Sequence, residues 1–544
     1  MDLVFGFFLA LLLSTVLVPV FMRYAPALHL IDLPSEDRKV HTVPIPRSGG
    51  IPIVLGASIS ILVWLGVEPE FKGFFLSALV IVVFGILDDT SELGHRWKFF
   101  GQILAVVVFI SSGNLIERVP FFGLDGVSGW ISYPLTFFFL LGVTNAVNLS
   151  DGLDGLAAGN SLLSFGLIAL LAIFIDVPSV AVISLAVVGG LIGFLRFNTH
   201  PATVFMGDTG SQFLGFCCGG LAVFLTQHEN SAMSPILPLV ILGLPILDTL
   251  VVMLVRAHQR RSLFVADRSH LHHQFLKLGL RHYEVVAVLY AMQGVLVFQA
   301  FMLRYHSDWI ILAVYLLFCT AILGVLAIGR TNNWQLHREE LVYDGRERRN
   351  RWLRKIDWYY YRSTKIIQWL LGSFLIVSSV FISSTSKSLG SFSLIAVVCV
   401  PVLAALFWKH PGWLKRILFY TACAFVVNGF LLSTVDKPYY SNIVDVFIGV
   451  MVLLVMLAIR MTRKEVFRPD NKDFLVLVLV LCVPFFPITG IDEFSFSRAV
   501  IWLAVLLYTC EFTLVRGGRH KHGFLSIASV ISLVIVCIQN NWLN

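Results

Sequence analysis

The stretch PLTFFFLLGVTNAVNLSDGLDGLAAGNSLLSFGLIALLAIFI, residues 134–175, places a polar, glycine-containing segment between two apolar runs. With their flanking apolar residues, both runs approach the ~20 residues that an α-helix needs to cross a bilayer. The segment between them, NAVNLSDGLDGLAAG (145–159), carries two Asn and two Asp at the edge of these runs, where uncompensated polar groups are costly. The stretch therefore predicts two membrane-spanning helices joined by a functional polar loop.

Apolar runs of this kind recur along the whole chain of 544 residues. Hydrophobic residues make up 57% of the sequence, charged residues 13%, and the mean hydropathy is +0.83, which excludes an ordinary soluble protein. We predict an all-α, polytopic integral membrane protein with about 11 transmembrane helices in an N-terminal core and about 7 more after it. The core spans are expected near residues 3–21, 49–66, 72–87, 99–112, 131–145, 158–175, 178–195, 211–226, 235–255, 284–303 and 308–328.

The domain organisation is expected to follow the charge distribution. A basic cytoplasmic linker at 331–365, which contains the run RERRNRWLRK, separates a core at 1–330 from a C-terminal transmembrane bundle at 366–544. The bundle has no acidic or histidine cluster at its span ends. Its role stays open between binding a partner enzyme, passing the lipid-linked product onward and an accessory function without catalytic consequence. Its seven spans are expected near 366–384, 391–408, 415–434, 443–459, 473–489, 499–515 and 523–540.

The basic residues indicate the orientation of the chain. When the loops are assigned alternately to the two sides, almost all Lys and Arg fall on one side, which the positive-inside rule makes cytoplasmic. The few exceptions on the other side are Lys72, Arg118, Arg304, Lys387, Lys437 and Arg498.

Five polar loops share the cytoplasmic side and hold nearly every Asp and His that lies close to a span end. Because ionisable groups at membrane borders are costly, this shared sidedness predicts one polar site at the inner membrane surface. The five loops are residues 37–50, 88–102, 145–159, 196–211 and 256–279.

The side chains of these loops suit phosphate chemistry. Carboxylates and amides are hard oxygen ligands for Mg²⁺, which usually needs one or two protein carboxylates plus substrate phosphates. Glycines in MGDTGS and SDGLDG allow close backbone approach to a phosphate. We therefore expect a lipid phosphate and a cytosolic nucleotide-linked compound as substrates. The oxygen ligands are Asp88, Asp89, Asn145, Asn148, Asp151, Asp154 and Asp208, and the cations and donors are Lys39, Lys98, Arg268, His270, His272 and His273.

Each loop alone also has a simpler interpretation. The Asp pair fits a solvated helix end, DGLDG a turn, and MGDTGS a helix N-cap. HLHH (270–273) could bind zinc, but it has no nearby Cys and lacks the i, i+4 spacing of a helical metal pair. A cation-coupled transporter and a non-catalytic scaffold are the competing functions. A transporter should keep ionisable groups near the bilayer midplane, whereas here they gather at one face.

The motifs GILDDT, NAVNLSDGLDGLAAG, VFMGDTGS and DRSHLHHQFLKLG, with the earlier RKVHTVPIPRSGG, resemble the signature loops of the polyprenyl-phosphate N-acetylhexosamine-1-phosphate transferases. The resemblance covers residues 1 to about 330. It implies an integral membrane enzyme that moves a sugar-1-phosphate from a UDP-sugar to a polyprenyl phosphate and releases UMP. DRSHLHH followed by LKLG is similar to the bacterial GlcNAc-1-phosphate branch, whose enzymes start cell-surface polysaccharides.

This branch implies UDP-GlcNAc, or another UDP-N-acetylhexosamine, as donor and undecaprenyl phosphate as acceptor. It also implies a bacterial inner (plasma) membrane location with the active site on the cytoplasmic face. We expect Mg²⁺ as cofactor, with Mn²⁺ as an alternative, and no nucleic-acid partner. A homodimer stays open.

The resemblance also assigns roles to residues. It implies catalytic roles for Asp88, Asp89, Lys98, His272 and His273. It implies substrate-binding roles for Lys39, Asn145, Asp151, Asp154, Arg268 and His270. The implied metal ligands are Asn148 and Asp208. Direct attack by the lipid phosphate and a two-step route through a phosphorylated Asp are both chemically allowed.

Overall fold

The structure is a computed structural model. The chain forms two compact units, which are described separately. The first unit contains the elements up to α13, and the second contains those from α14 onward. The described residues are 2–32, 44–66, 68–121, 127–227, 231–259, 270–335, 346–381, 415, 418–423, 425–427, 438–460, 502–503, 505–510, 512–514 and 523–541.

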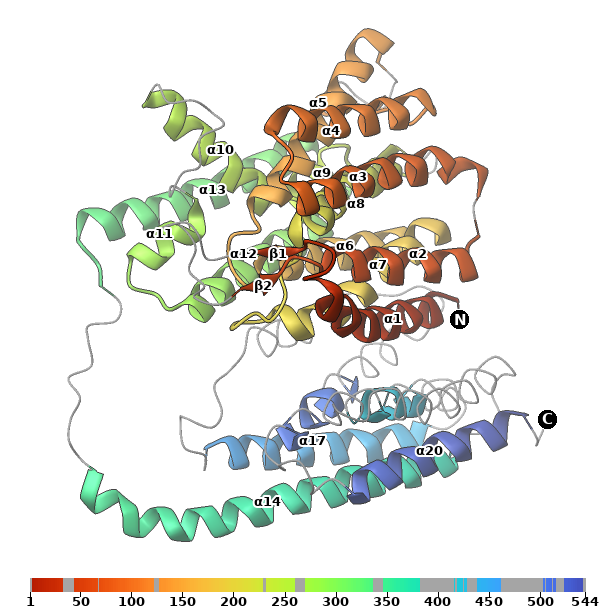
Figure 1. Cartoon of the computed structure of the whole chain (residues 1–544), viewed down its shortest axis with the longest axis vertical. Coiled ribbons are helices and arrows are strands. Elements are labelled where there is room, and N and C mark those ends of the chain that lie inside the picture. The colour runs from red at the N-terminus through yellow and green to blue at the C-terminus, as the bar shows by residue number, and fades with distance from the viewer. Residues whose placement is uncertain are drawn as a thin grey trace. The chain divides into compact units, whose positions relative to one another are not determined.

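The first unit is almost entirely helical (Figure 1). Its one described ladder is a two-residue antiparallel pair, β1 with β2, in which Ile31 lies opposite Pro46. The elements are α1 (Asp2–Tyr24), β1 (Ile31–Asp32), β2 (Ile45–Pro46), α2 (Gly50–Trp64), a 3₁₀ turn η1 (Pro69–Phe71), α3 (Lys72–Ser91), α4 (His95–Ser111), α5 (Gly129–Leu149), α6 (Leu156–Phe174), α7 (Pro178–Asn198), α8 (Gly207–Gln227), α9 (Leu237–Ile241), α10 (Gly243–His258), α11 (Leu271–Lys277), α12 (His282–Leu303) and α13 (Asp308–Thr331).

The prediction of an all-α, polytopic membrane protein is confirmed. Among the described residues, nine helices are long and apolar enough to cross a membrane. Each of the eleven spans expected in the core coincides with helix, although α2 and α4 are shorter, at 15 and 17 residues. The apolar runs therefore locate the helices of the core.

The ninth expected span, 235–255, was predicted as one helix and is two, α9 and α10, with the break at Leu242. Pro245 has no N–H to donate to the carbonyl of Ile241, which would be its partner in a continuous helix. The side chains of Ser164 and Gln293 donate to that carbonyl instead, each at 2.8 Å. A broken helix inside the bundle is stable because neighbouring helices satisfy the released backbone oxygen.

The centre of the first unit is formed by α6, α7 and α8, whose side chains are largely buried. α1 and α2 pack on α7, while α3 and α5 pack on α8 (Figure 1). α3 and α8 lie close together at Gly85, where an added Cβ would lie 2.6 Å from the Cα of Thr209. This contact brings the polar end of α3 against the start of α8.

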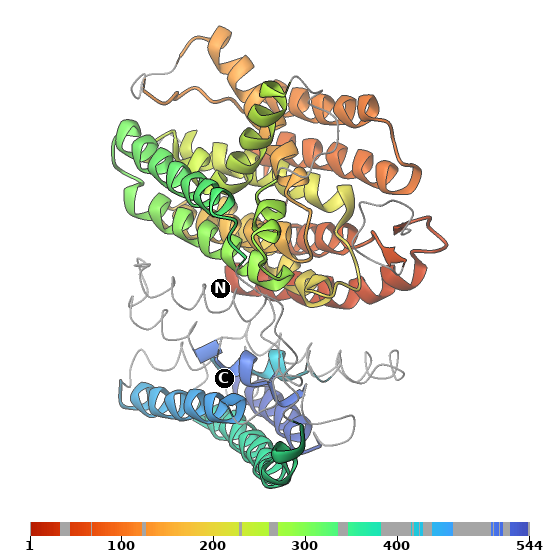
Figure 2. The same ribbon diagram turned by 90° about the vertical axis from the view of Figure 1, so that its left-hand side faces the viewer.

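The second unit contains α14 (Arg346–Phe381), α17 (Pro438–Arg460) and α20 (Gly523–Asn541). α14 lies along α20 (Figures 1 and 2), and the rings of Trp369 and Phe524 stack with centroids 3.8 Å apart. Helix is present in the expected spans 366–384, 443–459 and 523–540. The spans 391–408 and 473–489 lie outside the described residues, and 415–434 and 499–515 are described only in part. The linker role of 331–365 stays a prediction.

Candidate active site

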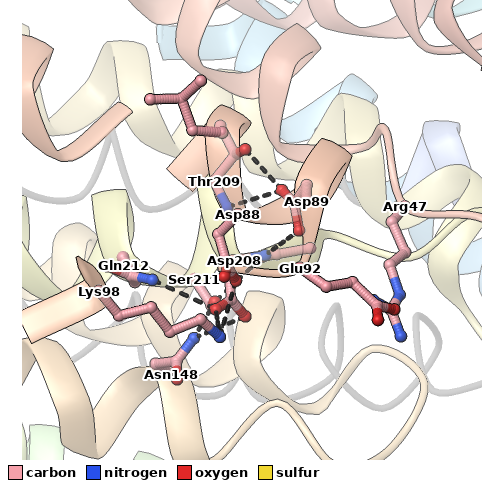
Figure 3. A network of polar contacts seen from close by, with 12 residues as sticks. Arg47, Asp88, Asp89, Glu92, Lys98, Asn148, Asp208, Thr209, Ser211 and Gln212 are labelled. Carbon is pink, nitrogen blue, oxygen red and sulfur yellow. Dashed lines mark hydrogen bonds and ion pairs between the residues drawn. The ribbon is translucent and has the colours of Figure 1, made fainter. Parts of the chain in front are cut away.

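Four helix ends bring together the central polar cluster (Figure 3). Asp88 lies in the last turn of α3, Lys98 in the first turn of α4, Asn148 in the last turn of α5 and Asp208 in the first turn of α8. The Nζ atom of Lys98 lies 2.7 Å from Oδ2 of Asp88 and also forms an ion pair with Oδ2 of Asp208. One cation therefore lies between two carboxylates that would otherwise repel each other.

Amide side chains orient Asp208 within this cluster. Nδ2 of Asn148 donates to Oδ1 of Asp208 at 3.2 Å and to Oγ of Ser211 at 2.8 Å. Nε2 of Gln212 donates to Oδ2 of Asp208 at 3.3 Å. The donors use both carboxylate oxygens, so the position of Asp208 is fixed by α5 and by its own helix.

Asn145 is linked to Asp208 through two glutamines. Its Nδ2 donates to Oε1 of Gln102 at 2.8 Å, and Gln102 in turn donates to Oε1 of Gln212 at 3.1 Å. Asn145 was predicted to bind substrate, and the structure places it in the hydrogen-bonded chain that supports Gln212.

Asp89 points away from Lys98 and binds the start of α8. Its Oδ1 accepts the backbone N–H of Asp208 at 2.8 Å, while its Oδ2 accepts the backbone N–H and the hydroxyl of Thr209 at 2.9 and 2.6 Å. A buried carboxylate is favourable at a helix N-terminus, where backbone N–H groups have no partner within the helix. The two aspartates therefore have different contacts: Asp88 faces Lys98 and Asp89 holds α8.

The backbone at Gly207 makes the Asp89 contact feasible. Gly207 has a φ of +72°, a left-handed conformation that favours glycine. An added Cβ there would lie 2.6 Å from Oδ2 of Asp89. The glycine of the MGD motif is thus required both by the turn and by the carboxylate beside it.

The cluster fits a hard divalent cation. Oδ1 of Asp88 is buried and has no hydrogen-bond partner among the described residues. Together with the Asp208 carboxylate and the Asn148 amide, it offers the oxygen ligands that Mg²⁺ prefers. The residues present therefore fit a divalent cation, and the roles of Asn148 and Asp208 as its ligands stay a prediction.

Backbone hydrogen bonds join the segment around the start of α2 to the residues before α8. Pro46, Gly49 and Gly50 exchange three backbone hydrogen bonds of 2.7–2.9 Å with Phe205 and Met206, which lie directly before Gly207. The described part of the RKVHTVPIPRSGG motif therefore lies beside the start of α8. Two predicted substrate-binding residues, Lys39 of this motif and Arg268, lie outside the described residues.

The loop between α5 and α6 connects the cluster with the histidines. Burial raises the pKa of Asp151 to about 7, and the negative charge of Asp208 adds to this shift. An added Cβ at Gly152 would lie 2.6 Å from Cε1 of His272, so this imidazole packs on the loop. Burial, followed by the charge of His273, lowers the pKa of His272 to about 3. His272 is therefore a neutral imidazole at physiological pH.

Comparisons with known proteins identify the family of the chain. Residues 71–226 match the family described as glycosyl transferase family 4. A probable undecaprenyl-phosphate N-acetylglucosaminyl 1-phosphate transferase of Bacillus subtilis (strain 168) is 35% identical over 315 residues, which cover 57% of this chain and 88% of that protein. The chain belongs to the polyprenyl-phosphate N-acetylhexosamine-1-phosphate transferase family.

Other relatives of this transferase family represent further branches. A phospho-N-acetylmuramoyl-pentapeptide-transferase of Oceanobacillus iheyensis is 34% identical, and the match covers 54% of this chain and 96% of that protein. A decaprenyl-phosphate N-acetylglucosaminephosphotransferase of Mycobacterium leprae is 32% identical, with 51% and 77% covered. The family region at 71–226 contains the whole Asp88–Lys98–Asp208 cluster, which favours the transferase over the transporter and scaffold alternatives.

Asp248 of α10 contacts the histidine motif, and the sequence did not lead us to predict this contact. Its Oδ2 lies 2.9 Å from Nδ1 of His270, and its Oδ1 accepts the backbone N–H of Leu271 at 2.6 Å. Asp248 thereby holds the first predicted histidine and the start of α11. A signal was present, because a carboxylate inside the apolar run GLPILDTLVV is costly and marks a functional candidate.

Asp154, which is predicted to bind substrate, contacts another segment of the chain in the structure. Its Oδ2 lies 2.7 Å from Nδ1 of His200 and accepts the backbone N–H of Ala202 at 3.1 Å. The structure therefore places Asp154 against the connection between α7 and α8, and its predicted contact with substrate stays a prediction.

Proposed function

We propose that this transferase moves GlcNAc-1-phosphate from UDP-GlcNAc to undecaprenyl phosphate and releases UMP, as the first step of a cell-surface polysaccharide. The observation that carries the proposal is the Asp88–Lys98–Asp208 cluster at the polar ends of apolar helices. Such a position lets a substrate in lipid and a substrate in water meet at the same charged groups. The GlcNAc donor is supported by the DRSHLHH and LKLG motifs and by the named activity of the Bacillus subtilis relative.

The reaction joins two anions. An oxygen of the lipid phosphate forms a bond to the β-phosphorus of the donor, and the bond from that phosphorus to the bridging oxygen breaks. UMP leaves with the bridging oxygen. Because both partners are negatively charged, neutralisation and positioning are the main requirements, and fixed cations supply them without reorganisation during the reaction.

Lys98 is suited to contact the reacting phosphates, because it already lies between two carboxylates at the helix ends. Asp88 fits a role in orienting Lys98 and a cation. A strong base is not required, since the second pKa of a phosphate monoester is about 6 and the lipid phosphate is largely ionised near pH 7. The neutral His272 imidazole is able to donate a hydrogen bond to the donor phosphates.

Mg²⁺, or Mn²⁺ in its place, would be held by Asp208 and Asn148, with Oδ1 of Asp88 as a further oxygen ligand. When bound, the ion supplies positive charge at the donor pyrophosphate. Asp89 keeps Asp208 at the correct place by holding the start of α8.

The location follows from the charge distribution. We infer a bacterial inner (plasma) membrane protein with this cluster on the cytoplasmic face, because the loops that carry it are on the side enriched in Lys and Arg. That face is also where a nucleotide-linked sugar would be available.

The test is UMP release by the purified full-length protein with Mg²⁺, undecaprenyl phosphate and one donor at a time: UDP-GlcNAc, UDP-GalNAc or UDP-MurNAc-pentapeptide. We expect turnover with UDP-GlcNAc, a loss of about 10²–10³-fold in kcat for Lys98→Ala, and a comparable loss for Asp208→Asn. Thr90→Ala is the matched control, because its hydroxyl donates to carbonyls of its own helix.

Leaving out the lipid acceptor separates the two routes. A two-step enzyme would release one equivalent of UMP from donor alone, whereas direct transfer would release none. Turnover with another donor but not UDP-GlcNAc would reject the proposed sugar. A folded, lipid-supplied protein that releases no UMP from any donor would reject the proposed reaction.

A further inference from the structure

A second group of ligand-type side chains lies beside the loop between α5 and α6. Asp154 comes from this loop, His200 from the connection between α7 and α8, and His282 from the first residue of α12. One ligand atom from each of the three lies within 4.8 Å of the other two. Three segments that are far apart in sequence therefore present two imidazoles and a carboxylate to one point.

The imidazole rings of His200 and His282 lie against each other, and one of the ring nitrogens is buried without a hydrogen-bond partner among the described residues. The rings of His200 and His282 stack with their centroids 4.1 Å apart and an interplanar angle of 22°. Nδ1 of His282 is buried and has no hydrogen-bond partner among the described residues. A buried ring nitrogen without a partner is costly, and a bound ion nearby would give this imidazole a ligand role.

The donor set indicates the kind of ion. Two imidazole nitrogens and one carboxylate oxygen suit Zn²⁺ and similar transition-metal ions, whereas Mg²⁺ prefers oxygen ligands alone. Ligands of a tetrahedral Zn²⁺ lie about 3.3 Å apart, given bonds of about 2.0–2.1 Å. Here Oδ2 of Asp154 lies 2.7 Å from Nδ1 of His200, and one ligand atom of each residue lies within 4.8 Å of the other two, which is close to the spacing that such an ion needs.

The site is accessible from solvent. The His200 side chain is exposed and that of Asp154 is partly exposed, which provides an entry path and room for a water molecule as a fourth ligand. The ion would also fix the loop that carries Asp151 and Gly152, and Gly152 contacts His272.

We propose that Asp154, His200 and His282 bind a divalent transition-metal ion of the Zn²⁺ class, at a site separate from the Asp88–Asp208 cluster. The proposal goes beyond the transferase reaction and does not depend on it. Occupancy joins the connection between α7 and α8, the start of α12 and the loop before α6, so the ion acts as a structural clamp next to the active site.

The experiment measures metal binding without turnover. Full-length protein is purified with a histidine-free tag, stripped with chelator and titrated with Zn²⁺ by calorimetry in excess Mg²⁺. Co²⁺ then serves as a probe, because a four-coordinate site gives a characteristic visible d–d band. We expect one Zn²⁺ per chain, and at least about 10–100-fold weaker binding for His200→Gln and for His282→Gln, because losing a direct ligand should cost no less than losing a group that only orients a ligand.

His258→Gln is the matched control, since His258 is exposed at the end of α10 and should bind Zn²⁺ as the wild type does. The melting temperature of each variant without metal shows that it is folded. Failure of the wild type to bind Zn²⁺ in excess Mg²⁺ would overturn the proposal. So would unchanged binding in both His200→Gln and His282→Gln together with loss in His273→Gln, because the ion would then be bound by the 270–273 segment.

Discussion

Asp248 is a buried carboxylate that orients the first histidine of the 270–273 segment. It binds Nδ1 of His270 and the backbone N–H of Leu271 at the same time. Because a carboxylate oxygen can only accept, the contact orients the ring with Nδ1 as the donor toward Asp248. Asp248 is a positioning residue, since it acts on the site through His270.

Replacing Asp248 by Asn should preserve the bond to Leu271 but place an N–H group opposite His270. We expect Asp248→Asn to lower kcat/KM by about 10–100-fold, which corresponds to the loss of a hydrogen bond to a charged group. UMP release measures the effect, and Asp248→Glu should recover part of it. Equal turnover by Asp248→Asn and the wild type would show that the tautomer of His270 has no role.

The raised pKa of Asp151 predicts a pH dependence of stability. The folded protein binds the proton of Asp151 more tightly than the unfolded chain does, since its pKa rises from 3.8 to about 7. Stability therefore falls as the pH rises through this interval. Asn cannot ionise, so Asp151→Asn should be more stable than the wild type at about pH 8 and no more stable below about pH 4.

Thermal unfolding in detergent, without metal or donor, measures this difference. We expect the melting temperature of Asp151→Asn to exceed that of the wild type by about 2–4 °C at the higher pH, the shift that about 1 kcal/mol produces in a mid-sized domain. Asp154→Asn is the comparison on the same loop. A difference for Asp151→Asn that grows toward low pH would contradict the assignment.

At the scale of elements, the position of α8 depends on a carboxylate from α3. Asp89 accepts three hydrogen bonds from Asp208 and Thr209, whereas Asn would offer one acceptor oxygen and turn an N–H group toward the helix N-terminus. We expect Asp89→Asn to lower the free energy of unfolding by about 1.5–3 kcal/mol and to reduce turnover.

Thr209→Val provides the matched control for this prediction. It removes the hydroxyl bond and keeps both backbone bonds, so it should cost about 0.5–1.5 kcal/mol. Chemical denaturation and UMP release on the same samples give both quantities. An Asp89→Asn protein that is as stable as wild type but inactive would instead assign Asp89 a direct part in the chemistry.

The sequence was informative about elements because membrane helices need long apolar runs, and each of the eleven runs expected in the core coincides with helix. The short helix α11 lies in a segment that was expected to be a polar loop. It did not show the break at Leu242, since the hydropathy of 235–255 is continuous and only Pro245 marks the interruption. The motifs also predicted that Asp88, Lys98, Asn148 and Asp208 lie together. The separate contacts of Asp88 and Asp89 depend on how α3 packs on α8, which one sequence does not reveal.

At the scale of the whole molecule, the relatives match only part of the chain. The Bacillus subtilis relative is matched over 88% of its length by 57% of this protein. A transferase of this family therefore does not need a second unit like that formed by α14, α17 and α20. The chemistry of the Asp88–Asp208 cluster should belong to the first unit alone.

A chain that ends after about residue 335 should consequently retain UMP release. We expect a kcat within about threefold of the full-length value, a change of less than 1 kcal/mol in the barrier. Size-exclusion behaviour in detergent establishes that the shortened protein is folded. A folded, shortened protein without activity would show that the C-terminal unit is required for catalysis.

The close contact at Gly85 has an evolutionary consequence. Because the backbones of α3 and α8 touch there, the distance between Asp88 and Asp208 is set by main-chain packing, and even a methyl group would push the helices apart. Descendants of this protein could exchange side chains in the loops around the cluster and accept another sugar without rebuilding the reaction centre. Gly85 itself should tolerate no such exchange, so donor preference can diversify while the chemistry is inherited unchanged.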